Sequence, residues 1–347
     1  MAMELRKAVI ARATILVFSL TILLLILLVV SLSIGSSIIS IKDVFSCVFL
    51  QECDRVTLNI VRYRIARSTT SFLVGALLAL SGTFIQAVAR NPLAEPYILG
   101  LSSTALSAIA ITILVYPGVI VSRISLMIVS FCGAFAGYVL TTLLSTLAGG
   151  SSLSLILSGI AVTTMFSGIS YMLLYVAQTK LAGLHFRPDL MLLGSTASAQ
   201  IIDAQILFTI LAIGIIVMYV YDLPRKLNAY VFGDSLAKQL GYNPRSLSTI
   251  TALIVSILTG ACVSVVGIVG FIGLVAPHIA RLIAGTSDHR ITVIISLLVG
   301  SILSAAADIA AKMMSIYMPY GEFPLGIVTS IIGAPFLAYL IIKGGRR

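Results

Sequence analysis

The sequence predicts an all-α protein that crosses a membrane many times. Hydrophobic residues make up 59% of the 347 residues and only 10% are charged, against about 25% in an ordinary soluble domain. The apolar residues gather into runs of about 20, the length that a helix needs to cross a bilayer. So few charges cannot cover a soluble surface, and the composition therefore excludes a soluble enzyme, a disordered chain and a coiled coil.

Ten transmembrane helices are expected from these runs. The first run follows Arg6 and Lys7. A signal peptide also begins with basic residues, but its apolar stretch is about 7–15 residues long, so this longer run is interpreted as a retained helix. The eighth run is short and follows the seventh through Gly267, Gly270 and Gly273. The predicted helices cover residues 9–34, 65–89, 96–116, 122–147, 152–177, 201–221, 248–269, 271–284, 291–316 and 323–342.

The basic residues predict how the chain is oriented in the cell membrane. An even number of helices places both termini on one side, and an excess of Lys and Arg predicts that this side is the cytoplasm. The excess is small because Arg55, Arg62, Arg64 and Arg67 gather on the expected outer side, just before the second helix. From the residues alone, this cluster fits interfacial anchors as well as a functional contact.

Residues 222–247 form the one substantial polar insert, between the sixth and seventh helices. Residues 235–240 are expected to form a short helix, with Asp234 or Ser235 as its cap and Gly241 as its stop. Connections between helices usually run about 2–8 residues. This longer segment therefore predicts a cytoplasmic docking element, and an ordinary connector is the alternative.

The sequence holds no motif for ATP binding or metalloenzyme chemistry. It lacks G-x-x-x-x-G-K-[ST], H-E-x-x-H and paired C-x-x-C, and its three histidines stand far apart. We therefore expect no catalytic residue, no metal site and no cofactor in this chain. Asp308 is the one acid well inside a predicted helix, which makes it a functional candidate, although Lys312 at i+4 offers it a local ion pair.

Two further features bear on partners and covalent links. The net charge of +10 comes from scattered basic residues, without the dense patch that a nucleic acid requires, so the lipid bilayer is the expected environment and no nucleic acid is expected. Cys47 and Cys53 lie in the expected outer loop. A disulfide between them fits that compartment, and two free thiols are the alternative.

Eight sequence blocks stand in one order from residue 64 onward. They are RIAR at 64–67, GALLALSG at 75–82, RNPLAEP at 90–96, GDSLAKQLG at 233–241, GIVGFIGLVAPHIAR at 267–281, DHR at 288–290, EFPLG at 322–326 and GAPF at 333–336. Together they resemble the FecCD family, the permease subunits of ABC importers for iron–siderophores, haem and cobalamin. The resemblance covers most of the chain.

The resemblance implies one permease domain over residues 1–347 with the type II importer fold, working as a homodimer. Helices five and ten would line a path between the two copies. Two cytoplasmic ABC ATPase subunits, which hold ATP and Mg²⁺, would dock on the insert, and an extracytoplasmic solute-binding protein would dock outside. The chain itself would not be an enzyme. It would pass a bulky metal chelate, namely an iron–siderophore, haem or cobalamin, by ATP-driven alternating access.

Two alternatives stay open from the sequence. The family also includes oxyanion importers, so molybdate or tungstate is one alternative cargo. An ion-driven secondary transporter is the other, although it would need membrane carboxylates or broken-helix ion sites and would leave the insert unexplained. Many relatives have Trp before the glycine that matches Gly194, whereas this chain has no Trp, so no relative's substrate is carried over.

The resemblance also implies roles for particular residues. Lys312 stands where the family has an Arg, and Lys lacks the planar fork of Arg. Gly333, Ala334 and Pro335 fit a gate as well as a packing kink, because Pro frees backbone carbonyls in a membrane helix. The implied sites are binding-protein docking at Arg64, Arg67 and Lys312, ATPase coupling at Gly233, Asp234, Ser235, Leu240 and Gly241, and a pathway or gate at Gly333, Ala334 and Pro335.

Overall fold

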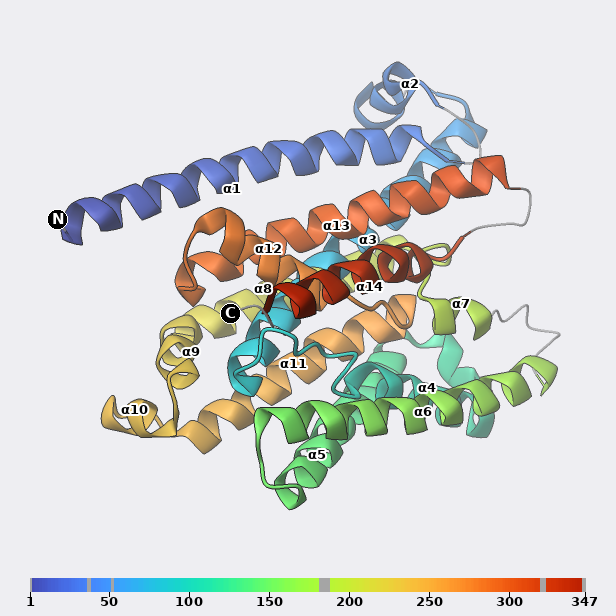
Figure 1. The fold of residues 1–347 in the computed structure, drawn as a ribbon. Helices are drawn as coiled ribbons and strands as arrows, with labels where there is room; N and C mark the ends of the chain where they lie inside the picture. The colour runs from blue at the N-terminus through green and yellow to red at the C-terminus, as the bar shows by residue number, and fades with distance from the viewer. Residues whose placement is uncertain (1, 36–38, 51–52, 181–187, 319–322, 345–347) are drawn as a thin grey trace.

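The protein is a bundle of helices. The computed structural model describes residues 2–35, 39–50, 53–180, 188–318 and 323–344, and every regular element within them is a helix (Figure 1). The helices in chain order are α1 (Ala2–Ser33), α2 (Ile41–Phe45), the π-helix η1 (Ser46–Leu50), α3 (Arg55–Ala89), α4 (Leu101–Val115), the 3₁₀-helix η2 (Pro117–Val121), α5 (Arg123–Leu147), α6 (Ser152–Lys180), α7 (Pro188–Leu193), α8 (Ile201–Val220), α9 (Leu223–Val231), α10 (Asp234–Gln239), α11 (Pro244–Val266), α12 (Ile272–Ala284), α13 (His289–Tyr317) and α14 (Leu325–Gly344).

Each of the ten predicted helices coincides with a helix of the structure. Among the described residues, seven helices are long and apolar enough to cross a membrane, and α4, α12 and α14 supply three shorter apolar helices. The predicted start of the second helix at residue 65 is wrong, because α3 begins at Arg55. Asp54 caps it by accepting hydrogen bonds from the N–H groups of Val56 and Thr57 at 3.1 and 3.2 Å. The first turns of α3 contain the four arginines, so they do not form an apolar run and the sequence did not predict them as helix.

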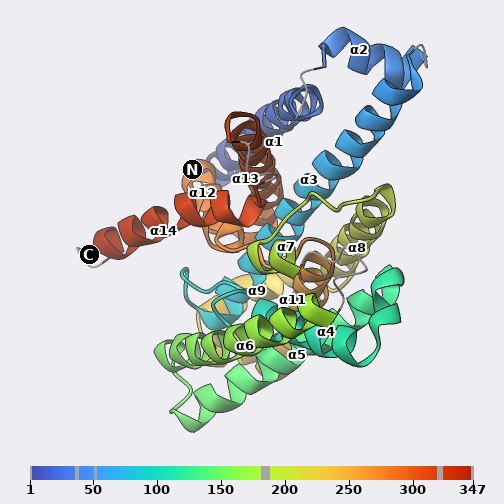
Figure 2. The ribbon, with the colours of Figure 1, turned by 90° about the vertical axis from the view of Figure 1, so that its right-hand side faces the viewer.

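The long helix α3 forms the centre of the bundle. It packs against α11, α12 and α13 and also touches α1, α8 and α9. Figure 2 shows α3 running between a group made of α1, α12 and α13 and a group made of α4, α5 and α6. Small residues permit this close packing, since a side chain at Gly75 would collide with the backbone carbonyl of Gly300 on α13.

A short break of five residues, 267–271, separates α11 from α12. Gly267 and Phe271 both have positive φ, at 78° and 70°, which ends one helix and starts the next. Neighbouring segments form hydrogen bonds with backbone groups that the break leaves unpaired. Ser195 donates its N–H to the carbonyl of Val266 at 2.8 Å, and Ile268 donates its N–H to the carbonyl of Met191 at 3.0 Å. This 267–271 break therefore joins α11 and α12 to α7 and the segment that follows it.

The two ends of the bundle carry different short helices. One end, here called the α10 end, holds α9, α10 and the start of α1 (Figure 1). The opposite end, here called the α2 end, holds α2, η1 and α7. The insert at 222–247 contains two helices, α9 and α10, whereas the sequence predicted only one. Any site at one end is thus separated from the other by the length of α3.

Candidate functional sites

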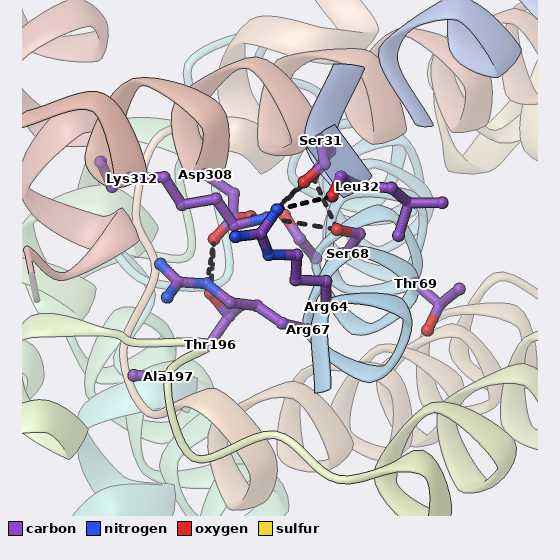
Figure 3. Close-up of polar contacts among 12 residues, drawn as sticks. Ser31, Leu32, Arg64, Arg67, Ser68, Thr69, Thr196, Ala197, Asp308 and Lys312 are labelled. Atoms are coloured by element: carbon purple, nitrogen blue, oxygen red, sulfur yellow. Dashed lines mark hydrogen bonds and ion pairs between the residues drawn. The ribbon is translucent and has the colours of Figure 1, made fainter. Parts of the chain in front are cut away.

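A buried polar cluster lies near the α2 end, where α1, α3 and α13 meet (Figure 3). Its centre is Asp308 on α13. Arg67 donates its Nε–H to Oδ1 of Asp308 at 3.0 Å, and the hydroxyl of Thr196 donates to the same oxygen at 2.7 Å. The ammonium of Lys312 lies 2.8 Å from Oδ2. The ion pair expected between Asp308 and Lys312 is therefore present, with Arg67 as a second cation.

The cluster also fixes the end of α1. Lys312 donates to the hydroxyls of Ser31 and Ser68 at 2.9 and 3.2 Å. Arg64 donates from Nη1 to the carbonyls of Leu32 and Ser33, both at 2.9 Å. These carbonyls lie in the last turn of α1, where a cation is favourable for the helix dipole and for unpaired carbonyl groups.

The three predicted docking residues line one pocket at this end. Its volume is about 340 Å³, and Arg64, Arg67 and Lys312 share its wall with Tyr63 and Ser315. Their side chains do not project from the surface: each of the three residues is only 3–4% exposed. The exposed members of the Arg cluster are Arg55 and Arg62, and the sequence pattern does not distinguish them from the buried pair.

The short helix predicted in the insert is α10, and it is displaced by one residue from the prediction. Its N-cap is Gly233 and its C-cap is Leu240, so Asp234 stands in the first turn and does not cap it with its side chain. Gly241 follows with a φ of 82° and ends the helix as predicted. Ser235, Leu240 and Gly241 are exposed at the α10 end, so this helix offers a surface outside the bundle.

Asp234 instead forms an ion pair with Arg90, the residue that ends α3. Arg90 also donates its Nε–H to the carbonyl of Tyr230 at 2.9 Å, and its guanidinium lies 4.3 Å from the centre of the Tyr230 ring. The sequence alone did not predict this contact, because its two residues lie 144 positions apart in the chain. The one available signal was an Arg and an Asp in two blocks of the same family pattern.

The candidate gate lies on α14 beside the 267–271 break. A side chain at Gly333 would collide with the ring of Phe271, so the glycine permits a close approach of α14 to the break. Ala334 and Pro335 are exposed on the same helix. The structure thus connects the predicted gate to the break, a contact that neither sequence block reveals alone.

Cys47 and Cys53 form a disulfide with their Cα atoms 5.3 Å apart. Glu95 is buried with its side chain against Gly273 and its carboxyl near the N–H groups of Phe271 and Gly273. Within the described ranges, no group of three or more His, Cys, Asp or Glu side chains could hold a metal ion. Residue 322 of the EFPLG block lies outside those ranges.

Asp288 and Asn228 join α9 to the start of α13. Asp288 caps α13 by accepting the N–H of Arg290 at 3.0 Å. The amide of Asn228 donates to Asp288 at 2.6 Å and accepts the backbone N–H of His289 at 2.9 Å. Burial raises the pKa of Asp288, but the hydrogen bonds from Arg290 and Asn228 outweigh it and lower the pKa to about 2. The cap is therefore charged at neutral pH.

A comparison with family models decides the classification. The FecCD transport family matches residues 23–343. The chain belongs to this family. FecCD proteins are permease subunits of ABC importers, so the chain is a multi-pass membrane protein whose family works with an ATPase in a partner subunit.

Individual relatives agree over nearly the whole FecCD chain. It is 35% identical to the iron(3+)-hydroxamate import permease FhuB of Bacillus subtilis, over 91% of this chain and 80% of that protein. It is 31% identical to the hemin transport permease HmuU of Yersinia pestis, over 93% of this chain and 94% of that protein. An inward-facing structure assigned to the metal-chelate type of ABC transporter aligns with a TM-score of 0.74 at 26% identity, over 95% of this chain and 99% of that one.

Proposed function

We propose that this FecCD chain is the membrane subunit of a binding-protein-dependent importer that carries a bulky metal chelate by ATP-driven alternating access. The proposal rests on one observation above all: α10 lies exposed at one end of the bundle and is held to the end of α3 through Asp234 and Arg90. A short helix presented in this way suits a partner that pushes on it. The α10 end is then cytoplasmic, with both termini on that side.

The partners follow from this orientation. Two cytoplasmic ATPase subunits bind ATP and Mg²⁺, and each receives α10 of one permease copy in a groove. Closure of the ATPase pair moves α10 as a rigid body, which is a common way to convert ligand binding into a conformational change. A second copy of this chain completes the path, with α6 and α14 facing it and Gly333, Ala334 and Pro335 near the gate.

The solute-binding protein docks at the α2 end in this scheme. Arg55 and Arg62 are exposed there, and the pocket behind them contains Arg64, Arg67 and Lys312. Carboxylates of the binding protein would pair with arginine through charge-assisted hydrogen bonds, often two in parallel. Such pairs contribute more to steering and register than to affinity, which suits a partner that must leave after delivery.

The substrate class is inferred from the relatives. Their names cover ferric hydroxamate, ferric dicitrate, hemin and cobalamin, which share large size and a bound metal. An ion-driven mechanism would rely on Asp308, but Arg67 and Lys312 both neutralise that carboxylate. This pairing supports the ATP-driven scheme over the ion-driven one.

Native mass spectrometry of the protein, purified from its own membrane in mild detergent, tests the proposed assembly. We expect two copies of this chain together with two subunits that carry a P-loop. A chain that purifies alone, and whose solute flux in vesicles follows a proton or sodium gradient without ATP, would overturn the proposal in favour of a secondary transporter.

A further inference from the structure

Residues 90–100 connect α3 to α4 and run from the α10 end into the bundle. The segment is tightly folded: Asn91 accepts the N–H of Leu93 at 2.9 Å through its side chain, and Leu99 donates to the carbonyl of Glu95 at 3.0 Å. Pro92 and Pro96 fix two further φ angles. A segment with so little conformational freedom transmits a displacement and does not absorb it.

Arg90, at the start of this segment, contacts the insert. Arg90 contacts Tyr230 of α9 through the ring and the carbonyl, and it contacts Asp234 of α10 through an ion pair. Its own backbone has a φ of 49° and closes α3, with its N–H donating to Ala87 at 3.3 Å. A shift of α9 and α10 therefore pulls on the point where α3 ends and the connecting segment begins.

The middle of the segment contacts the start of α12. Glu95 is buried, its side chain and that of Pro96 pack against Gly273, and its carboxyl lies near the N–H groups of Phe271 and Gly273. These are among the donors that a helix leaves unpaired at its N-terminus. Burial raises the pKa of the Glu95 carboxyl to about 8, so a neutral glutamine closely resembles it at that position.

A second contact ties the same two regions together. Gln86, one turn before the end of α3, donates to the carbonyl of Gly273 at 3.3 Å and accepts from Arg281 of α12 at 2.8 Å. On the far side of the break, the ring of Phe271 packs directly against Gly333 of α14. The 267–271 break thus lies between the connecting segment and the candidate gate.

We propose that residues 90–100 form a mechanical linkage from α10 to the 267–271 break and α14, in which Arg90 and Glu95 are positioning residues. Movement of α10 would reach the break through Arg90, the folded segment and Glu95, and would reach the candidate gate through Phe271 and Gly333. The direction of use, from ATPase to gate, rests on the proposed function. The linkage itself is a property of this chain.

The linkage can be broken without unfolding the protein. The side chains of Arg90 and Asp234 are 33% and 57% exposed, and ion pairs at such positions contribute little to stability. Asp234→Asn and Arg90→Gln should therefore leave the fold intact. Arg225→Gln is a matched control, because Arg225 forms an exposed ion pair with Asp222 within the insert itself and not with a residue of α3.

Hydrogen exchange at the amides of Phe271 and Gly273 reports on the linkage, because the carboxyl of Glu95 lies near both amides. In the full chain in lipid nanodiscs, we expect Asp234→Asn and Arg90→Gln to speed exchange of the peptides that cover 267–274 by about fivefold, the lower range of measured couplings between sites. Arg225→Gln should not change it. Glu95→Ala should speed it most, and Glu95→Gln should retain protection.

The same variants are then assayed with the partner ATPase in proteoliposomes. We expect Asp234→Asn to lower the substrate transported per ATP hydrolysed while the melting temperature stays unchanged. Exchange at 267–274 that ignores Asp234→Asn, or that responds equally to Arg225→Gln, would overturn the linkage. If no ATPase binds the chain, the proposed function fails, whereas the exchange measurement still decides whether the linkage exists.

Discussion

Asp308 is a carboxylate enclosed within the bundle by Arg67, Lys312 and the hydroxyl of Thr196. Removing such charges from water costs several kcal/mol for each ion, and close pairing with additional hydrogen bonds offsets that cost. Because two cations depend on one carboxylate, this residue holds α3 and α13 together more effectively than any single surface pair. The cluster thus has a structural role whatever docks near it.

Asp308→Ala should lower the free energy of unfolding by about 3–5 kcal/mol, because it leaves two buried cations without their shared carboxylate. Urea titration in detergent, followed by far-ultraviolet circular dichroism, measures the loss. Arg225→Ala removes an exposed cation in a surface pair and should cost less than about 1 kcal/mol. Equal losses in the two variants would contradict the structural role of the cluster.

The capping carboxylate of Asp288 has a pKa of about 2, below its usual value of 3.8. A lowered folded-state pKa means that the cap stabilises the protein fully above pH 3.8 and loses this effect as the pH falls toward 2. Asp288→Ala should cost about 1 kcal/mol at neutral pH, as for other caps. The difference in stability between wild type and variant should shrink between pH 4 and 2. A difference that stays constant over this range would show that the charge does not matter.

At the scale of elements, apolar runs reveal helices whose side chains face lipid or the core, and they miss helices whose polar groups pair inside the protein. This is why α3 starts at Arg55 and not at residue 65. The amphipathic helix α9 has no apolar run at all, and its position depends on partners such as Arg90 and Asp288, which are remote in sequence. A local signal was sufficient for Gly241, because it ends α10 within one turn.

Gly241→Pro tests whether the exact end of α10 matters for function. Gly241 has a φ of 82° and donates its N–H to the carbonyl of Lys238 at 2.9 Å. Proline fixes φ near −65° and has no N–H to donate, so α10 should lose its last turn. We expect ATP-driven uptake to fall at least tenfold, as for a lost coupling of about 1.4 kcal/mol or more, while the bundle still folds.

A matched substitution separates this effect from general damage to a loop. Gly150, between α5 and α6, also has a positive φ and donates its N–H to the carbonyl of Ser145 at 2.8 Å. Gly150→Pro should disturb its own turn and leave coupling through α10 unchanged. Uptake that is unaffected by Gly241→Pro, or reduced equally by both changes, would contradict the role assigned to α10.

At the scale of the molecule, the FecCD chain separates two polar regions across an apolar bundle. Arginines and a cationic pocket occupy the α2 end, and the exposed helix α10 occupies the other end. The sequence predicts this arrangement through its family blocks and its charge distribution. It does not predict the contacts that join blocks to one another, such as Glu95 with Phe271 or Gly333 with the same residue, because these depend on how α3, α12 and α14 pack.

Uptake by proteoliposomes tests the central claim, that this chain imports a metal chelate with energy from a partner ATPase. The vesicles would contain the chain with its co-purified ATPase, and the solute-binding protein would be added outside, loaded in turn with a ferric hydroxamate, haem or cobalamin. We predict that one of these accumulates inside only when ATP and Mg²⁺ reach the ATPase. Accumulation that follows an ion gradient and ignores ATP would contradict the account.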